Sequence, residues 1–143
     1  MQAIIDVRRG GQDAAQLTVL VTKDGALYTG AVSSKRHGDG RCKFSDGRVY
    51  EGSWVDDVCH GHGKMTFPCG KVYEGEWANG MRSSGKMTYA NGPVLVYDGQ
   101  WANNSPHGIG KVTYAGGYVY DGELARGKRC GQGKMTFPDG AVY

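Results

Sequence analysis

Proline is scarce in this sequence, at 4 of 143 residues, and no apolar run approaches the ~20 residues of a membrane-spanning helix. So few prolines without a three-residue period exclude a collagen-like chain. The opening residues, "MQAIIDVRRGG", contain too short an apolar run for a signal peptide and no small-residue cleavage site. Without a secretory signal, the four cysteines are expected to be reduced thiols in the cytoplasm.

Strong charge of one sign is also missing. The net charge is +3, and the 17 basic residues are scattered with no run longer than two. Nucleic-acid binding requires a basic face or stripe, so we expect no nucleic-acid partner. The apolar fraction of 39% is low, but nine Tyr, three Trp and three Phe are too many aromatics for a disordered chain. The 25 glycines disfavour long helices, which leaves many short strands joined by glycine turns.

A repeat organises most of the chain. A Tyr that precedes x-Gly recurs at intervals of 22 to 24 residues. We therefore divide the chain into an unassigned extension (1–16), a half repeat (17–27), five repeats (28–49, 50–72, 73–96, 97–119 and 120–142) and the first residue of a further frame (143). The half repeat is inferred because "LVTKDGALY" matches the later "MTFPDGAVY".

Each repeat predicts two strands. We number its Tyr as position 1; Gly follows at position 3, Trp at position 5 in three repeats, His-Gly at positions 11 and 12, Gly at 14, and Phe or Tyr at 18. Both halves alternate with a period of two, which is the strand signal. The link "FPDGA" predicts a three-residue hairpin loop with Gly in the left-handed position.

These residues resemble MORN repeats (membrane occupation and recognition nexus). "YEGSWVDDVCHGHGKMTFPCG" and "YEGEWANGMRSSGKMTYANG" are similar to that family's Y-x-G-x-W-x-x-G-x-x-H-G-x-G-x-x-x-F/Y-x-x-G unit, and the resemblance covers roughly Leu17 to Tyr143. The first and last repeats lack the Trp, and the third lacks His-Gly and carries the insertion "PVLV". The insertion adds two residues before Tyr97, and an even number keeps Tyr97 on the same face of the sheet. We therefore expect a local bulge there and an unbroken array.

Alternation assigns two faces to the expected sheet. Positions 1, 3, 5, 12, 14, 16 and 18 form an apolar face of Tyr, Gly, Trp, Met and Phe. Acids at positions 2 and 4 face lysines at position 15 across strands on the other face, as a solvated surface favours. A glycine between Tyr73 and Trp77 leaves a hole that we expect an aromatic or Met from the adjacent strand to fill.

The predicted fold is all-β: an open, twisted, single-layer solenoid of tandem antiparallel hairpins with an aromatic groove. One layer leaves its apolar face only partly covered, and a large exposed apolar stripe indicates a partner. The candidate groove residues are Tyr50, Trp54, Met65, Phe67, Tyr73, Trp77, Met87, Tyr89, Tyr97, Trp101, Tyr114, Tyr120, Met135 and Phe137. Two roles remain open for the methionines: filling holes over the glycines, or docking a partner's amphipathic helix.

Catalytic and metal chemistry find little support in the pattern. Cys59 and His60 lie near one end of their predicted hairpin and Cys69 at the other, ~20–25 Å away, too far to share a metal ion. Only a site shared between two chains is left for Cys59, His60 and His62. No helix follows the "GxG" pairs to make a phosphate loop, and a single layer offers no deep pocket. We expect neither enzyme activity nor a cofactor.

The expected function is a non-enzymatic scaffold that binds a protein segment and assembles as a dimer or oligomer through an edge repeat. The family resemblance implies an organiser at the cytoskeleton, cilium or flagellum, or membrane periphery. One alternative is binding of anionic phospholipid through basic hairpin tips, whose residues are Lys35, Arg36, Arg126, Lys128 and Arg129. A second alternative is that the array is an accessory part of a larger enzyme.

Overall fold

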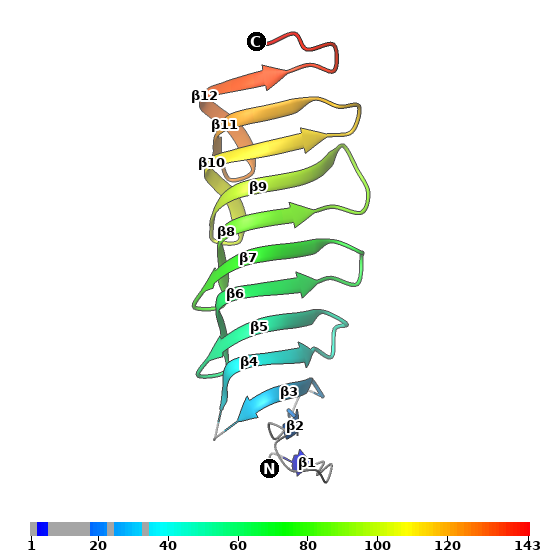
Figure 1. Ribbon diagram of the computed structural model, residues 1–143, viewed down its shortest axis with the longest axis vertical. Helices are drawn as coiled ribbons and strands as arrows, with labels where there is room; N and C mark the ends of the chain where they lie inside the picture. The colour runs from blue at the N-terminus through cyan, green and yellow to red at the C-terminus, as the bar shows by residue number, and fades with distance from the viewer. Residues whose placement is uncertain (1–2, 6–17, 23–24, 33–34) are drawn as a thin grey trace, which may run out of the picture.

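The computed structural model describes residues 3–5, 18–22, 25–32 and 35–143. They form one antiparallel twelve-stranded sheet in which each strand pairs with the next strand of the chain. Figure 1 shows the strands stacked in chain order along the long axis, with the two termini at opposite ends. The strands are β1 (Ala3–Ile5), β2 (Thr18–Val21), β3 (Leu27–Val32), β4 (Arg36–Lys43), β5 (Val49–Val55), β6 (Val58–Thr66), β7 (Val72–Ala78), β8 (Met81–Thr88), β9 (Val94–Ala102), β10 (Ser105–Tyr114), β11 (Val119–Ala125) and β12 (Lys128–Thr136). The predicted all-β array of hairpins is confirmed, and no helix in the described ranges could span a membrane.

The predicted three-residue turn follows every repeat except the third, whose insertion makes a longer loop in which the Tyr89 amide donates to the Leu95 carbonyl at 2.8 Å. The amide of Phe67 donates to the Lys71 carbonyl at 2.9 Å, and the amide of Gly70 donates to the Phe67 carbonyl at 2.9 Å. Gly70 has a φ of 85°, a left-handed conformation that favours glycine. Thr22 and Ala26 close the same kind of turn in the half repeat, with an amide-to-carbonyl distance of 3.0 Å.

A second turn, which we did not predict, closes the second to fifth repeats at positions 7 and 8. Both residues of this two-residue turn have positive φ, as a type I′ turn requires. The pairs with these angles are Asp56 and Asp57 (49° and 70°), Asn79 and Gly80 (51° and 79°), Asn103 and Asn104 (49° and 59°), and Arg126 and Gly127 (51° and 76°). Asn-Gly between strands is a strong hairpin signal, so the third repeat alone could have revealed this turn.

The His-Gly motif lies in a bulge. In the second repeat Gly52 pairs with Gly63 and Trp54 pairs with Cys59, so two extra residues are accommodated on β6. Gly61, inside the bulge, has a φ of 77°, which explains why glycine follows His60.

The third repeat lacks one of these residues, and its strands return to register within the shorter bulge. Glu76 pairs with Ser84 and Trp77 with Arg82. Tyr97 then pairs with Met87, so the insertion before it leaves the array continuous as expected.

Each position 1 tyrosine covers a pair of glycines in its own hairpin. Tyr50 is fully buried, and its hydroxyl donates to the Ser53 carbonyl at 2.9 Å. A Cβ atom placed on Gly63 would overlap the Tyr50 ring, and one on Gly52 would approach the Tyr50 hydroxyl to 2.8 Å. We expected the adjacent strand to fill the hole over the position 3 glycine; the Tyr of the same strand fills it instead.

Each position 5 tryptophan links its repeat to the preceding one. The Trp77 indole N–H donates to the Gly63 carbonyl at 3.2 Å. The Trp77 ring meets Tyr50 of the preceding repeat edge-on at 5.4 Å and Tyr73 of its own repeat at 5.1 Å. Trp54 and Trp101 make the corresponding indole hydrogen bonds, at 3.1 Å and 3.0 Å.

These contacts bury the apolar face more completely than we expected from a single layer. Tyr73 is 0% exposed, Met87 2% and Trp54 2%. The expected exposed stripe of Tyr, Trp and Met is therefore wrong, because rings seated on backbone need no second layer. The position 18 rings of Phe44 and Phe67 stay half-buried and pack against this core.

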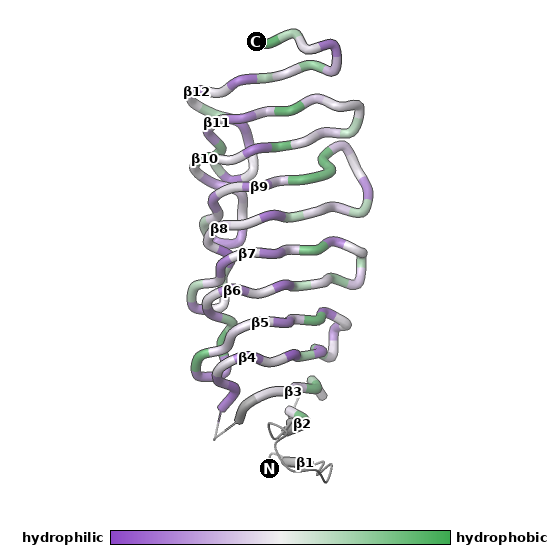
Figure 2. Tube along the Cα trace, viewed as in Figure 1, coloured by the Kyte–Doolittle hydropathy of each residue, from purple (hydrophilic) through white to green (hydrophobic). Residues whose placement is uncertain are grey.

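The other face carries a row of alternating charges, as predicted. In this row Glu51 pairs with Lys64, which in turn faces Glu74 on the next strand. The row continues through Lys86, Asp98, Lys111, Asp121 and Lys134. Figure 2 shows hydrophilic and hydrophobic residues interspersed along each strand from β4 to β12. Opposite charges in neighbouring strands stabilise this solvated face modestly.

The chain before the first repeat extends the sheet. β1 pairs with β2 and β2 with β3, so the half repeat contributes a strand, and part of the unassigned extension contributes one more. The remainder of residues 1–16, and Leu17, lie outside the described residues.

Truncating Trp77 tests the Trp–Tyr packing. Trp77→Ala removes a ring that is 6% exposed together with its hydrogen bond, and we expect the free energy of unfolding to fall by ~3–5 kcal/mol. Urea denaturation followed by circular dichroism measures the change. Lys64→Ala, on the solvated face, is the control. A loss below ~1 kcal/mol for Trp77→Ala would contradict the packing.

The buried tyrosines predict instability at alkaline pH. Burial raises the pKa of Tyr73 and of Tyr97 to about 12, above the ordinary value near 10. Because the folded pKa is the higher one, this stability is fully present below about pH 10 and is lost as the pH rises towards 12. We expect the urea midpoint to fall between pH 9 and about 11.5, with tyrosinate absorbance rising as the chain unfolds. A constant midpoint across that range would show that the phenols are accessible.

Candidate functional site

The side chains at position 10 lie on the apolar face, opposite the residue at position 5. This placement follows from the two-residue turn, which brings Cys59 opposite Trp54 and Arg82 opposite Trp77. The sequence could have predicted this placement, because side chains alternate between the two faces along a strand. The even positions 12 to 18 lie on the apolar face, and position 10 belongs to the same series. Our assignment of the apolar face began at position 12 and therefore did not include the position 10 side chains. The position 10 residues are Arg36, Cys59, Arg82, Pro106 and Arg129.

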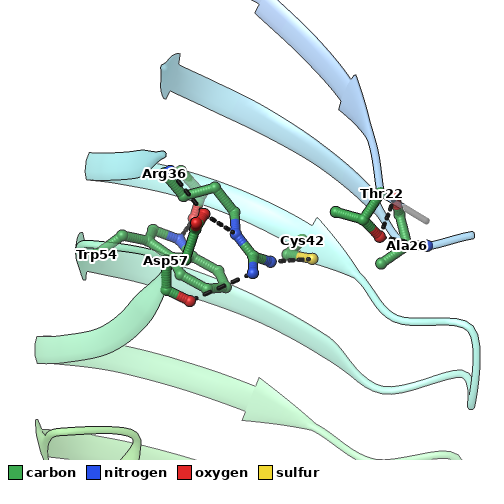
Figure 3. A network of polar contacts seen from close by, with 7 residues as sticks. Thr22, Ala26, Arg36, Cys42, Trp54 and Asp57 are labelled. Atoms are coloured by element: carbon green, nitrogen blue, oxygen red, sulfur yellow. Dashed lines mark hydrogen bonds and ion pairs between the residues drawn. The ribbon is translucent and has the colours of Figure 1, made fainter. Parts of the chain in front are cut away.

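Arg36 is held between two repeats, as Figure 3 shows. Its guanidinium carbon lies 4.4 Å from the Trp54 ring centre and 5.8 Å from that of Tyr28. Its Nε donates to Asp57 Oδ1 at 3.1 Å, and Nη2 donates to the Asp57 carbonyl at 3.2 Å. Nη1 lies 3.4 Å from Cys42 Sγ. The charge is therefore balanced by a carboxylate and two aromatic faces.

Arg82 repeats this arrangement without the carboxylate. Its guanidinium carbon lies 4.6 Å from the Trp101 ring centre and 5.7 Å from that of Tyr73. Nε approaches Asn104 Oδ1 at 3.4 Å, and Nη2 donates to the Asn104 carbonyl at 2.9 Å. Burial lowers the pKa of Arg82, which still remains charged at neutral pH. Within the described ranges, no Asp or Glu forms an ion pair with Arg82.

An open cleft lies beside these arginines, across the second repeat. It has a volume of about 290 Å³. Aromatic rings of Phe44, Phe67 and Trp77 line it, and the cationic groups of Arg36 and Arg82 border it. It therefore combines apolar surface with positive charge, which suits an apolar segment that carries a carboxylate.

A second cleft lies further along the same face and is uncharged. It has a volume of about 300 Å³ and is lined by Tyr89, Pro93, Val94 and Tyr114 among others. Pro93 and Val94 belong to the insertion of the third repeat, so this irregularity shapes the groove. We refer to these two clefts together as the groove; each is lined by half-buried position 18 rings.

The candidate groove residues fall into two groups. The structure buries Tyr50, Trp54, Met65, Tyr73, Trp77, Met87, Tyr97, Trp101 and Tyr120 in the core. It leaves Phe67, Tyr89, Tyr114, Met135 and Phe137 half-buried or exposed. Only the second group has substantial ring or side-chain surface available to a partner.

The residues considered for a metal site shared between chains, Cys59, His60 and His62, differ in exposure. Cys59 is 8% exposed, and burial raises the pKa of its thiol to about 12, which disfavours the thiolate that a metal needs. His60 and His62 are exposed. His62 Nδ1 lies 3.2 Å from Glu76 Oε1, and His60 Nδ1 accepts the Asn79 amide at 3.3 Å. Within the described ranges, no group of three or more His, Cys, Asp or Glu could hold a metal ion.

The basic hairpin tips are fewer than expected. Lys35, Arg126 and Lys128 are exposed near the two-residue turns. Arg36 is wrong as a tip residue, because its side chain is only 14% exposed and points onto Trp54. Arg129 is exposed, but its guanidinium carbon lies 5.7 Å from the Tyr120 ring centre on the apolar face.

The family model for the MORN repeat matches residues 32–47, 50–71, 73–94, 97–117 and 120–142. A comparison with curated proteins finds no match. The matched segments include the strands from β4 to β12, and those of the second to fifth repeats each contain the two-residue turn, the bulge and the glycine pair described above. With most of its length matched by this family model, the chain belongs to the MORN repeat family.

Proposed function

We propose that this chain is a non-enzymatic scaffold whose groove binds an apolar segment of a partner protein, such as an amphipathic helix, through at least one acidic side chain. MORN arrays are repeat scaffolds generally linked to protein or membrane interaction. The observation that carries the proposal is Arg82, a cation on the apolar face whose side chain pairs with the neutral Asn104. A carboxylate from a partner would supply the missing counter-charge in a partly desolvated place.

The half-buried rings support the same proposal. Phe44 and Phe67 flank the charged cleft, and Tyr89 and Tyr114 flank the uncharged one. Each ring retains surface that a partner's apolar side chains would cover, and aromatics in such positions commonly dominate binding energy. Met65 and Met87 support the rings from beneath, as core residues.

The proposal includes assembly. An open sheet has edge strands with unpaired backbone groups, which proteins cover or use for pairing. We propose that the chain forms a homodimer or larger oligomer through an edge repeat, in the cytoplasm at the cytoskeleton, a cilium or flagellum, or a membrane periphery.

Binding of anionic phospholipid is the second candidate. Lys35, Arg126 and Lys128 are exposed beside the two-residue turns, where they could approach a membrane surface. Asp56, in the turn of the second repeat, interrupts this basic edge. The groove and the tips are separate surfaces, so variants can separate the two functions.

A pair of neighbouring residues on opposite faces tests groove binding. We expect Phe67→Ala to lose specifically captured partner proteins while keeping the wild-type circular dichroism spectrum, and Thr66→Ala, on the solvated face, to keep them. Quantitative affinity capture from cells measures this. The double variant Arg126→Ala, Lys128→Ala should keep protein partners as well. If that variant loses flotation with phosphatidylserine vesicles while Phe67→Ala changes neither readout, the lipid function replaces the groove function.

Met87 separates the two roles considered for the methionines. Because Met87 is 2% exposed beneath the groove, Met87→Lys should unfold the array, whereas the volume-conserving Met87→Leu should cost less than ~1.5 kcal/mol. Thermal denaturation followed by circular dichroism measures both. A folded Met87→Lys protein would place this side chain at the groove surface, contrary to the structure.

A further inference from the structure

Three arginines line the charged cleft, and they differ in how their charge is balanced. Arg36 Nε lies 3.1 Å from Asp57 Oδ1, and Arg48 Nε lies 2.7 Å from Asp46 Oδ2. In the described part of the chain, Arg82 forms no ion pair with an Asp or Glu side chain. The cleft therefore contains one guanidinium group whose charge no described carboxylate balances.

The surroundings of Arg36 and Arg82 are otherwise closely similar. The backbone amide and Nε of each arginine approach one side-chain oxygen at position 8 of the next repeat. These distances are 2.8 and 3.1 Å for Asp57, and 3.1 and 3.4 Å for Asn104. Nη2 of each arginine donates to the backbone carbonyl of the same residue, and each guanidinium stacks on the position 5 Trp of that repeat. The position 8 side chain thus accepts the same bonds in both places, once as a carboxylate and once as an amide.

In the second to fifth repeats, position 8 carries a side-chain acceptor only where an arginine precedes it at position 10. Cys59 and Pro106 occupy position 10 of the second and fourth repeats, and Gly80 and Gly127 follow them at position 8. These glycines donate a backbone hydrogen bond to the carbonyls of Cys59 and Pro106, at 2.9 Å in both cases. The identity of position 8 therefore decides how the arginine of the preceding repeat is partnered.

An amide and a carboxylate at position 8 have different consequences for a ligand in the cleft. An aspartate neutralises its arginine and repels a second carboxylate, whereas an asparagine accepts hydrogen bonds and leaves the cation free to make charge-assisted ones. Nη1 of Arg82 has no hydrogen-bond partner among the described residues, while Nη1 of Arg36 lies 3.4 Å from Cys42 Sγ. Burial also lowers the pKa of Arg82, so its partly desolvated charge gains more from a counter-charge than a fully solvated arginine does.

We infer that Asn104 is the specificity-determining residue of the groove: because it leaves Arg82 without a counter-charge, binding depends on one Asp or Glu side chain in the partner's apolar segment. The inference rests on the proposed function and deepens it, since it names the residue that selects the partner. Asp57 has the opposite role at Arg36, so the groove has one carboxylate site although two similarly placed arginines border it.

The composition of the cleft selects the occupant. A small inorganic anion would pair with Arg82 but leave the nearby rings of Phe44 and Phe67 uncovered. An acid carried on an apolar segment uses both features, because its carboxylate meets the guanidinium while its neighbours cover the rings. Covering the rings also excludes water from the ion pair, which strengthens it. The occupant is therefore an apolar segment of a partner protein that bears an acidic side chain.

The probe is a phage-displayed library of random peptides long enough to span both clefts, panned in parallel on the folded chain and its variants. Peptides whose binding Phe67→Ala weakens are groove binders, and those selected by the wild-type chain should combine apolar residues with an acid at one fixed place. Asn104→Asp should select apolar peptides that lack the acid. Asp57→Asn frees a second arginine, Arg36, which lies ~19 Å from Arg82 because β4 and β8 are four strands apart at ~4.8 Å each. It should select peptides with a second acid towards the other end.

One peptide selected by the wild-type chain then measures the coupling by fluorescence anisotropy. Its affinity should fall about tenfold for Asn104→Asp, and about tenfold when its acid is replaced by the corresponding amide. The two changes together should cost no more than either alone, because both remove the same ion pair. Asn103→Asp, the same change one residue earlier in the turn, is the matched control and should change the affinity less than twofold. The turn of the second repeat already holds Asp at both positions, so these variants should keep the wild-type circular dichroism spectrum.

Three outcomes would overturn the inference and leave the proposed function in place. Groove binders selected by the wild-type chain would lack an acid, their affinity would be unchanged by Asn104→Asp, or Asn103→Asp would weaken them equally, which would indicate general repulsion of negative charge. If no peptide is selected, or Phe67→Ala weakens none of them, the groove function fails and the inference fails with it. Binding of inorganic phosphate or phosphatidylserine vesicles that Asn104→Asp abolishes, without any acidic peptide being selected, would assign Arg82 to a free anion or a lipid headgroup and overturn the inference as well.

Discussion

The whole array depends on aromatic rings seated directly on backbone. Each position 1 tyrosine lies over two paired glycines, and Tyr50, Tyr73, Tyr97 and Tyr120 donate their hydroxyl to a carbonyl of their own strand, at 2.8 Å for Tyr73. Each tryptophan then bonds a glycine carbonyl of the preceding hairpin, at 3.2 Å for Trp77. A side chain on Gly63 would therefore displace the Tyr50 ring above it, and one on Gly85 would come within 2.6 Å of the Glu74 carbonyl oxygen and the Gly75 Cα. A single layer can thus exclude water without a second sheet or helices, and its length is set by the number of repeats.

Much of this fold could be predicted from the sequence, because the signals are local and repeat. Strand alternation, the Pro-Asp-Gly turn and the pairing of Glu51 with Lys64 are all found as predicted. The nearly complete burial of the Tyr and Trp rings could not be predicted from the sequence. It depends on the three-dimensional position of rings such as Tyr50, which lies over the glycines of its own hairpin. The role of Arg36 was missed for a related reason: a charged residue beside a turn suggests a solvated tip, and only the three-dimensional contact with Trp54 shows otherwise.

The same packing of rings on backbone also determines which side chains line the groove. Filling the core with Tyr, Trp and Met leaves the position 18 rings, Phe67 among them, at the boundary with solvent. The arginines approach that boundary from the other end of the hairpin, so apolar and cationic surface meet in one cleft. An enclosed active site would need a second layer to exclude water, whereas an open groove needs only a complementary segment. The fold therefore presents an open surface in which apolar rings and guanidinium groups lie side by side.

The alternation at position 10 makes the interfaces between hairpins unequal. Where Arg36 or Arg82 projects, neighbouring hairpins are joined by a stacked cation and a side-chain acceptor; where Cys59 or Pro106 stands, only the Trp or Leu contact and backbone hydrogen bonds remain. A uniform array could slip by one repeat without penalty, because every interface would be equivalent. In this chain a slip would place an arginine against a position 8 glycine and leave a partly buried cation unsatisfied. The alternation consequently gives successive interfaces different requirements, because Arg36 and Arg82 each need a side-chain acceptor at position 8 of the next repeat.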